Sequence, residues 1–369
     1  MVGIDDIPDA ILCNIFSRLP AEPMGRCRCV SMHWNRLISD PSFMMSRSSR
    51  IFVSCSGPES STPISISMLD ESNGSVTHSD FSMFKEIPTI KNWADRTIEF
   101  IGTFSGIIIL SVRDYIGWDS ELNSFMEERM ILYNPFTGVY EIFQDPYSPL
   151  PGDALAYGFG YGATPDELKL IRLRNFKLSN RNYDTCDVFN LKTRSWSQQE
   201  LIQNSQLQMF AGTIGTFLRG YLYWMGSLNM VALNVDKMVF SKMQLPDSAI
   251  NQYNHLGTRQ GCLWMITHTF DTTKYDVWVK NEQGVDNLWS KRCSFTLGLE
   301  LKSYFAFDRN IKITEDGRFV MNVLMDDAEQ LIIYDTSKQS YELLKSSTSF
   351  LRSLKYKESL IHPRNICHA

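Results

Sequence analysis

The side chains that could do chemistry are scattered along this 369-residue chain and are not gathered into motifs. The chain has eight cysteines and six histidines, but no Cys-x-x-Cys, His-Glu-x-x-His or Gly-x-Ser-x-Gly sequence. Zinc sites and hydrolytic nucleophiles depend on such spacings, because their side chains must converge on one point. We therefore predict no catalytic residue, no metal and no cofactor, and we do not expect an enzyme.

One glycine pattern, Gly158-x-Gly160-x-Gly162, could be mistaken for a phosphate-binding loop. Such a loop needs a helix directly after it, whose N-terminus holds the phosphate. Residues 168–173 follow instead with a strand pattern, so we expect the glycines to relieve crowding where strands pack closely. Two acidic pairs, Glu127 with Glu128 and Asp326 with Asp327, are predicted to be solvated charges in loops.

Composition excludes several classes of partner. The net charge is −5 and the sequence pI is about 5.8, whereas a nucleic-acid binder needs a basic patch to neutralise phosphates. The longest apolar run, residues 106–110, is far too short for a membrane span, and no secretory leader opens the chain. Scattered free thiols fit a reducing compartment. We therefore expect no nucleic acid, no membrane, and a cytoplasmic or nuclear location or both.

Residues 7–43 are the only clearly helical stretch. Apolar residues from Ile11 to Leu19 recur with the spacing of one helical face. Pro23 can open a second helix, and the residues around Trp34 give a third, which ends at Asp40-Pro41 because the residue before proline avoids the helical region. Three short helices cannot bury all their apolar side chains on one another, so the remainder should contact a partner or cap the following domain.

This stretch resembles an F-box, the motif that docks on an SKP-type adaptor of a cullin-based ubiquitin ligase. The matching pieces are Ile7-Pro8-Asp9, Ile11-Leu12, Ile15, residues 18–20, residues 26–30, Trp34, Leu37-Ile38 and residues 40–43. Gly25 and Met32 depart from the usual pattern. The resemblance implies an F-box at residues 1–48 whose adaptor-binding residues are Ile7, Pro8, Ile11, Leu12, Ile15, Phe16, Leu19, Pro20, Met24, Val30, Trp34 and Leu37.

Beyond residue 50 the chain becomes a repeat of short strands. Each apolar run ends in Asn or Asp, and a turn follows. Six positions after the Asn or Asp comes an apolar or aromatic residue that begins the next strand, as in Tyr133-Asn134 with Tyr140. Each pattern predicts a hairpin, and two more strands precede it. Four strands per unit at a spacing of roughly 40–60 residues are typical of propeller blades.

Five units are complete, and a sixth is split between the two ends of the repeat. Residues 51–55, 64–69 and 76–80 supply three strands, and residues 350–360 supply the fourth. Joined, they close the ring and leave no open edge. We therefore predict a mainly β, six-bladed, kelch-like propeller closed by the C-terminal strand and preceded by a small all-α F-box of three helices. A pair of stacked sheets is the alternative, but it leaves the last strand unexplained.

Residues 49–369 also resemble the F-box-associated domain of plant F-box proteins. The matching pieces include residues 132–138, 158–161, 188–196, 220–224, 240–246 and 356–360. The resemblance implies that the propeller recognises a substrate. Longer connections, such as residues 113–128, 175–185 and 267–274, are expected on the face opposite the F-box, where recognition usually resides. The candidate substrate-binding residues are aromatic or Arg, namely Arg113, Tyr115, Trp118, Phe125, Phe176, Arg181, Tyr183 and Phe270.

Taken together, the two resemblances predict a non-catalytic substrate-recognition subunit of an SCF-type (SKP–cullin–F-box) ubiquitin ligase. Its F-box would dock an SKP-type adaptor, and through it a cullin, while its propeller binds an unknown protein for ubiquitination and degradation. Two alternatives stay open. One is a propeller enzyme or glycan-binding module that the F-box only tethers, and the other is a scaffold acting outside any cullin ligase.

Overall fold

A computed structural model of the chain describes most of its length, with gaps. The residues left out of the description are 1–6, 20, 48–49, 57–64, 71–75, 81–95, 118–124, 144–153, 176–184, 201–212, 227, 251, 270–272, 281–288, 299–301, 304–310, 326–327, 345–348 and 369. The predicted substrate residues Trp118, Phe176, Arg181, Tyr183 and Phe270 lie outside the described part, as do Pro20 and the acidic pair at 326–327.

The N-terminal part is helical and contains one more helix than predicted. Its described elements are α1 (Asp9–Arg18), α2 (Ala21–Cys27), α3 (Met32–Ser39) and α4 (Pro41–Ser46). The prediction that the third helix ends at Asp40-Pro41 is confirmed, but the predicted count of three helices is wrong, because α4 follows. Asp40 does end α3, but its carboxylate also accepts hydrogen bonds from the amides of Ser42 and Phe43, with proline in the first turn of α4. This is the favourable arrangement for starting a helix.

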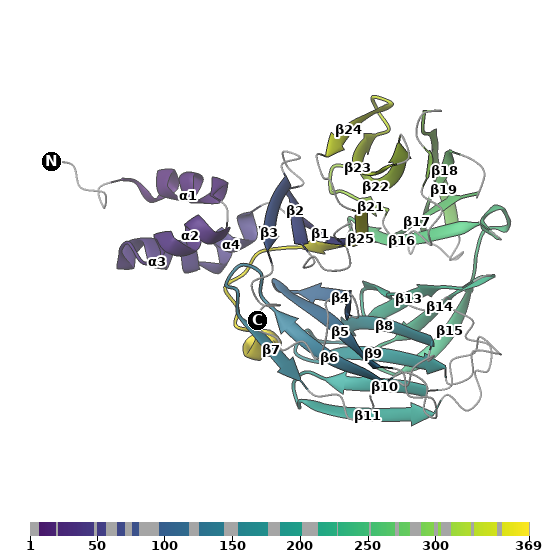
Figure 1. The fold of residues 1–369 in the computed structure, drawn as a ribbon, viewed down its shortest axis with the longest axis horizontal. Coiled ribbons are helices and arrows are strands. Elements are labelled where there is room, and N and C mark those ends of the chain that lie inside the picture. The colour runs from purple at the N-terminus through teal and green to yellow at the C-terminus, as the bar shows by residue number, and fades with distance from the viewer. Residues whose placement is uncertain are drawn as a thin grey trace.

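The described strands form six antiparallel sheets, drawn in Figure 1. The first sheet joins β25 (Ser349–Tyr356) to β1 (Arg50–Ser56), β2 (Ser65–Asp70) and β3 (Val76–Asp80). The second sheet consists of β4 (Arg96–Phe104), β5 (Ile107–Gly117), β6 (Phe125–Tyr133) and β7 (Tyr140–Phe143). The third consists of β8 (Ala154–Tyr161), β9 (Leu168–Asn175), β10 (Thr185–Asn190) and β11 (Ser195–Glu200).

The remaining sheets follow in chain order. The fourth is β12 (Thr216–Leu218), β13 (Tyr221–Met225), β14 (Asn229–Asn234), β15 (Val239–Gln244), and the fifth is β16 (Tyr253–Arg259), β17 (Cys262–His268), β18 (Lys274–Lys280), β19 (Trp289–Thr296). The sixth is β20 (Lys302–Ser303), β21 (Lys312–Ile313), β22 (Phe319–Met325), β23 (Ala328–Asp335), β24 (Ser340–Leu344). Two short 3₁₀ helices, η3 (Asp247–Ala249) and η4 (Pro363–His368), complete the described elements.

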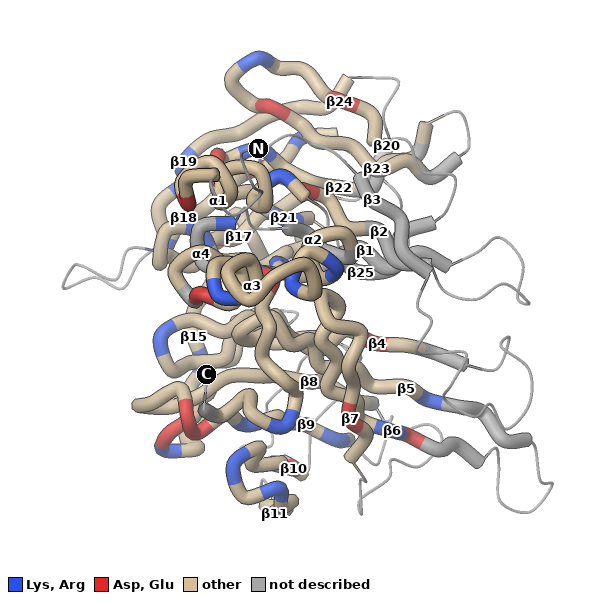
Figure 2. Tube along the Cα trace, turned by 90° about the vertical axis from the view of Figure 1, so that its left-hand side faces the viewer, with Lys and Arg blue, Asp and Glu red and all other residues tan. Residues whose placement is uncertain are grey.

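The sheets close into a ring. β1 pairs antiparallel with β25, with Phe52 opposite Leu354, so the first and last strands of the propeller share one sheet. The innermost strands touch in sequence, β25 with β4, β4 with β8, β8 with β12, β12 with β16, and β16 with β21. Figure 2 views the molecule from the helical end, with β24 and β11 on opposite sides of the ring. The predicted fold class, a mainly β propeller closed by its C-terminal strand, is confirmed.

Four outer hairpins use the turn chemistry that the sequence indicates. In each, one side-chain oxygen of an Asn or Asp accepts hydrogen bonds from the amides two and three residues later. The turns begin at Asn134, Asn190, Asn234 and Asp335. These side chains satisfy amides that the tight turn would leave unpaired.

The described innermost strand of the fourth sheet is short. The described strand is Thr216–Leu218. Residues just before it hydrogen-bond to the preceding blade. The backbone amide of Tyr157 donates to the carbonyl of Thr213, and the carbonyl of Tyr157 accepts from the amide of Gly215. The backbone there joins two blades and cannot also extend β12. The predicted strand at residues 350–360 ends earlier, at Tyr356.

Glycines on the innermost strands make room for aromatic rings of the next blade. A Cβ on Gly102 would overlap Phe159, and a Cβ on Gly160 would overlap the ring of Phe217. At Gly257, on the equivalent strand β16, no described atom lies within 4 Å of such a Cβ. Close packing between blades therefore holds at the first two positions and gives way to open space at the third.

We expect Gly160→Ala to lower the free energy of unfolding by about 1–3 kcal/mol, because the methyl group forces the Phe217 ring to move. Gly257→Ala is the matched control, expected to leave that free energy unchanged or to raise it by up to about 1 kcal/mol. Thermal unfolding of both full-length variants checks this. Equal destabilisation by the two substitutions would contradict the packing argument.

Candidate interaction surfaces

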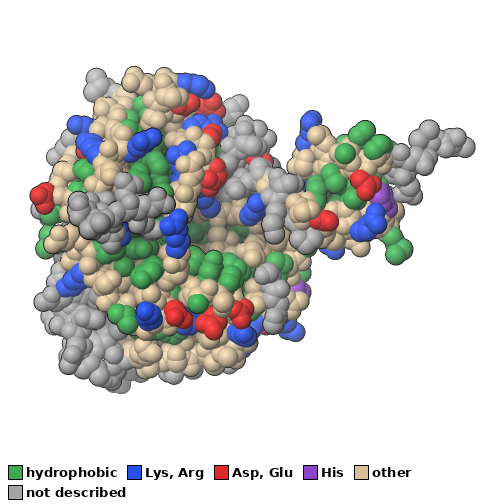
Figure 3. All heavy atoms as spheres, turned by 180° about the vertical axis from the view of Figure 1, so that it is seen from behind, with side chains coloured by type: hydrophobic (Ala, Val, Ile, Leu, Met, Phe, Trp, Pro, Cys, Tyr) green, Lys and Arg blue, Asp and Glu red, His purple; other side chains and the backbone are tan. Residues whose placement is uncertain are grey.

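The helical domain carries apolar side chains that its own fold does not cover. Among its described residues, Ile11 and Ile15 of α1 are 52% and 46% exposed, Val30 is 55% exposed and Met32 is 93% exposed. Ile11 and Ile15 are one helical turn apart and share a face. Figure 3 shows hydrophobic side chains on the surface of this domain, which projects from the propeller. Exposed apolar groups concentrated on a small domain mark a site for protein contact.

The predicted adaptor-binding residues divide into two groups. Leu12, Phe16 and Met24 are at most 1% exposed and pack in the core of the helical domain. Ile7, Leu19, Trp34 and Leu37 are half-buried against that core, and Trp34 meets the Phe16 ring edge-on at 4.9 Å. The exposed residues are Pro8, Ile11, Ile15 and Val30. Met32, which the sequence argument did not select, is the most exposed of the large apolar residues described.

Arg47 joins the helical domain to the propeller. Its guanidinium lies 2.6 Å from the carboxylate of Glu358, and both side chains are at most 2% exposed. It also donates to the carbonyls of Phe16 and Leu19, each at 2.9 Å, at the C-terminal end of α1. A cation at this end of a helix satisfies carbonyls without an intrahelical partner. One buried side chain thus ties α1 to the segment that follows the last strand.

The turn after β6 completes this junction. Asn134 uses its oxygen to shape its own turn and its Nδ2 to donate to the carbonyls of Ser359 and Ile361, at 3.0 and 2.8 Å. Phe136, from the same turn, is 8% exposed and packs into the helical core together with Leu360. The helical domain therefore packs on the propeller through side chains of both and is not tethered by a linker alone.

The predicted substrate-binding residues include three with a described backbone, and none of these lies in a loop. Arg113 and Tyr115 belong to β5 and Phe125 to β6, because both strands extend further than predicted. The Arg113 side chain is 14% exposed and contacts Glu99 and, at 3.6 Å, Glu128. The prediction of Arg113 as a loop residue is wrong, and its described contacts are with carboxylates of its own sheet.

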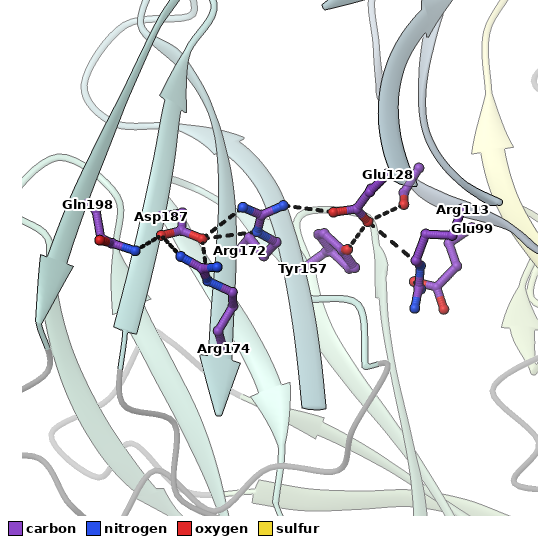
Figure 4. Close-up of polar contacts among 9 residues, drawn as sticks. Glu99, Arg113, Glu128, Tyr157, Arg172, Arg174, Asp187 and Gln198 are labelled. Atoms are coloured by element: carbon purple, nitrogen blue, oxygen red, sulfur yellow. Dashed lines mark hydrogen bonds and ion pairs between the residues drawn. The ribbon is translucent and has the colours of Figure 1, made fainter. Parts of the chain in front are cut away.

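The acidic residue Glu128, predicted to be solvated, lies instead at the centre of a buried network (Figure 4). Its carboxylate accepts from Ser111 at 2.5 Å, from Arg172 at 2.7 Å and from the hydroxyl of Tyr157. Arg172 is fully buried and reaches Asp187 at 2.9 Å. The network joins β5 and β6 of one sheet to β8, β9 and β10 of the next, so it fixes two blades to each other.

The described oppositely charged members of the network are equal in number. Three carboxylates, on Glu99, Glu128 and Asp187, face three guanidinium groups, on Arg113, Arg172 and Arg174. Burial, reinforced by the neighbouring Glu128 carboxylate, raises the pKa of Tyr157 well above its ordinary value, so its hydroxyl stays protonated and donates. Pairing every buried charge in this way is what makes such a cluster tolerable.

No described group of three or more His, Cys, Asp and Glu side chains could hold a metal ion. The described helices include none with the length and hydrophobicity to cross a membrane.

A sequence profile described as the F-box associated beta propeller domain matches residues 121–363, about two thirds of the chain. The chain belongs to the F-box-associated β-propeller family. A second profile, F-box-like, matches residues 4–49 and covers all four described helices. Both resemblances read from the sequence are thereby confirmed, and the chain is an F-box substrate-adaptor protein.

The relatives of this F-box protein that we find are from the plant Arabidopsis thaliana. The F-box protein CPR1 is 25% identical over 92% of this chain and 84% of its own length. The F-box/LRR-repeat/kelch-repeat protein At2g27520 is 22% identical over 92% of this chain and 90% of its own length. Among solved structures, TolB from Acinetobacter baumannii has a TM-score of 0.51 at 11% identity, covering 84% of this chain and 66% of that one. That likeness concerns the propeller fold alone.

Proposed function

We propose that this protein is the substrate-recognition subunit of an SCF-type ubiquitin ligase. Its F-box binds an SKP-type adaptor and, through it, a cullin, while the propeller binds a target protein for ubiquitination and proteasomal degradation. The observation that carries the proposal is the buried junction of Arg47 and Glu358 between the helical domain, with its exposed apolar surface, and the propeller. We further propose that it acts in the cytoplasm, the nucleus or both.

The proposed role is positional and non-catalytic. A target held on the propeller has a high effective concentration near a ubiquitin-loaded enzyme bound elsewhere in the complex. That concentration depends on geometry, because it is lost when the two sites cannot be spanned together. The buried contacts of Arg47, Asn134 and Phe136 restrict the angle between F-box and propeller, which is what a positional role requires.

We expect Ile11→Asp and Ile15→Asp each to weaken binding of an SKP-type adaptor by about tenfold or more. A carboxylate at the centre of an apolar contact must lose its water on binding, and central apolar anchors commonly contribute 2 kcal/mol or more. The measurement is co-purification and titration of full-length protein with the adaptor. Because both side chains are about half exposed, the substitutions test docking without disturbing the buried Leu12.

Val239→Asp is the matched control, since Val239 is a 57% exposed apolar residue on β15 of the propeller. It should bind the adaptor like the wild type. Failure of the wild-type protein to recruit adaptor and cullin, with both α1 variants indistinguishable from it, would exclude the proposal. That result would favour a binding module or scaffold that acts outside a cullin ligase.

A further inference from the structure

An open cavity of about 330 Å³ lies among the innermost strands of the propeller. Its wall is made by the innermost strands, and it includes the aromatic side chains of Phe104, Tyr161 and Phe217. These rings pack in series, with Phe104 5.7 Å from Tyr161 and Tyr161 4.7 Å from Phe217. The volume is on the order of ten times the roughly 30 Å³ that a water molecule occupies in the liquid, and it falls in the range of small-molecule sites.

The cavity exists because the packing between blades changes at one position. Phe159 fills the space beside Gly102, and Phe217 fills the space beside Gly160. Gly257, which also lines the cavity, has no described atom within 4 Å of where its Cβ would lie. The described residues of the next strand, β21, that line the wall are Lys312 and Ile313. Among the described residues, no side chain therefore fills the position beside Gly257 that Phe159 and Phe217 fill beside the other two glycines.

The charges on the wall have one sign. Lys312 and Lys355 line the cavity, and no Asp or Glu is among its described lining residues, although the whole chain has a net charge of −5. Lys355 donates to Glu315 at 2.7 Å, so part of its charge is balanced outside the cavity. Both lysines are partly exposed, which places their charge where the cavity meets solvent.

His255 adds a neutral polar group to the wall. Its Nε2 lies 3.3 Å from Nε2 of His268, with the two rings nearly parallel. Burial, the neighbouring His268 and Lys312 lower the pKa of His255 to about 3, so the imidazole carries no charge at neutral pH. The two facing nitrogens must share one proton as donor and acceptor, and the positive charge of the wall comes from the lysines.

We propose that this cavity binds a small organic carboxylate with an aromatic or branched apolar body. The apolar part would lie beside Gly257 and the rings of Tyr161 and Phe217, and the carboxylate would accept a charge-assisted hydrogen bond from Lys312. Such a ligand would touch strands of several blades at once and stabilise the closed ring by mass action. This site is separate from the helical surface to which an adaptor would bind.

Saturation-transfer NMR on the full-length protein tests the proposal with three probes, benzoate, phenylacetate and 1-naphthoate, each compared with the corresponding alcohol. We expect at least one carboxylate to bind about tenfold more tightly than its alcohol, the difference made by one charge-assisted contact. Gly257→Leu, whose side chain fills the open space, should abolish this binding. Gly257→Ala should retain it, which separates filling of the cavity from any change in the backbone.

Lys312→Met keeps the length of the side chain and removes its charge, so carboxylate and alcohol should then bind equally. Lys338→Met, on an exposed turn where the lysine is 73% exposed, is the control and should leave the preference intact. Three results would each overturn the proposal: no probe carboxylate binds, Gly257→Leu binds as the wild type does, or the alcohols bind as tightly as the acids. Loss of adaptor binding has no bearing on these outcomes.

Discussion

Glu128→Gln is expected to lower the free energy of unfolding by about 3–5 kcal/mol, although it changes the shape of the side chain very little. The substitution removes one of the two carboxylates that contact the fully buried Arg172, so Asp187 alone then faces both Arg172 and Arg174 and one buried positive charge is left uncompensated. Breaking one partner of a buried ion pair strands the other charge away from water, and that penalty exceeds the value of the pair itself. In a domain of this size the loss corresponds to a melting temperature lower by about 5 °C or more.

Differential scanning calorimetry of the full-length protein provides the measurement. Asp166→Asn is the control, because Asp166 pairs with Lys192 at the surface, where both side chains are about half exposed. Exposed pairs contribute little, so this variant should melt with the wild type. If Glu128→Gln melts with them too, the network does not hold the two blades together as we argue.

Arg47→Met should loosen the helical domain while the propeller remains folded. The substitution leaves Glu358 buried without its cation and frees the carbonyls of Phe16 and Leu19, a loss of about 3–5 kcal/mol. Because Arg47 contacts the end of α1, the effect should concentrate in residues 9–18. Native-state hydrogen exchange should show the amides of α1 exchanging at least about a hundredfold faster, while those of the propeller strands change little.

A double variant separates the charge from the packing. Arg47→Met combined with Glu358→Leu removes both charges at once, so it should recover much of the protection that the single variant loses. Arg364→Met is the control for loss of a surface arginine, since Arg364 is 73% exposed in its pair with Glu141. Unchanged exchange in α1 of the Arg47→Met protein would show that the junction is held by apolar contacts alone.

The architecture follows from local signals that a single sequence carries. Asn134, Asn190, Asn234 and Asp335 each shape a hairpin, and their regular recurrence indicates blades. The split sheet follows from a count of strands, and the pairing of β1 with β25 agrees with it. The turn side chains act on backbone amides only a few residues away, so the hairpins can be predicted locally. Closure of the ring follows from the need to leave no strand edge unpaired.

The contacts that build the candidate surfaces were less predictable. Arg113 and Glu128 were predicted to lie in a loop, but both lie in strands, where Arg113 pairs with Glu99 and Glu128 also pairs with Arg172 of another blade. That pairing spans 44 residues, and no local pattern encodes it. In α1, periodicity identifies the apolar positions but does not tell the buried Leu12 from the exposed Ile11, because that depends on where α3 and α4 pack.

The junction at Arg47 also has a consequence for synthesis. A ribosome makes the four helices first, whereas Glu358 and the strand β25 that closes the ring come more than 300 residues later. A nascent or prematurely terminated chain can therefore present its exposed apolar helix before anything fixes the direction in which that helix points. Only a chain translated through residue 360 can form both the Arg47–Glu358 pair and the contact of Leu360 with the helical core, so a shorter chain cannot fix the helical domain on the propeller in this way.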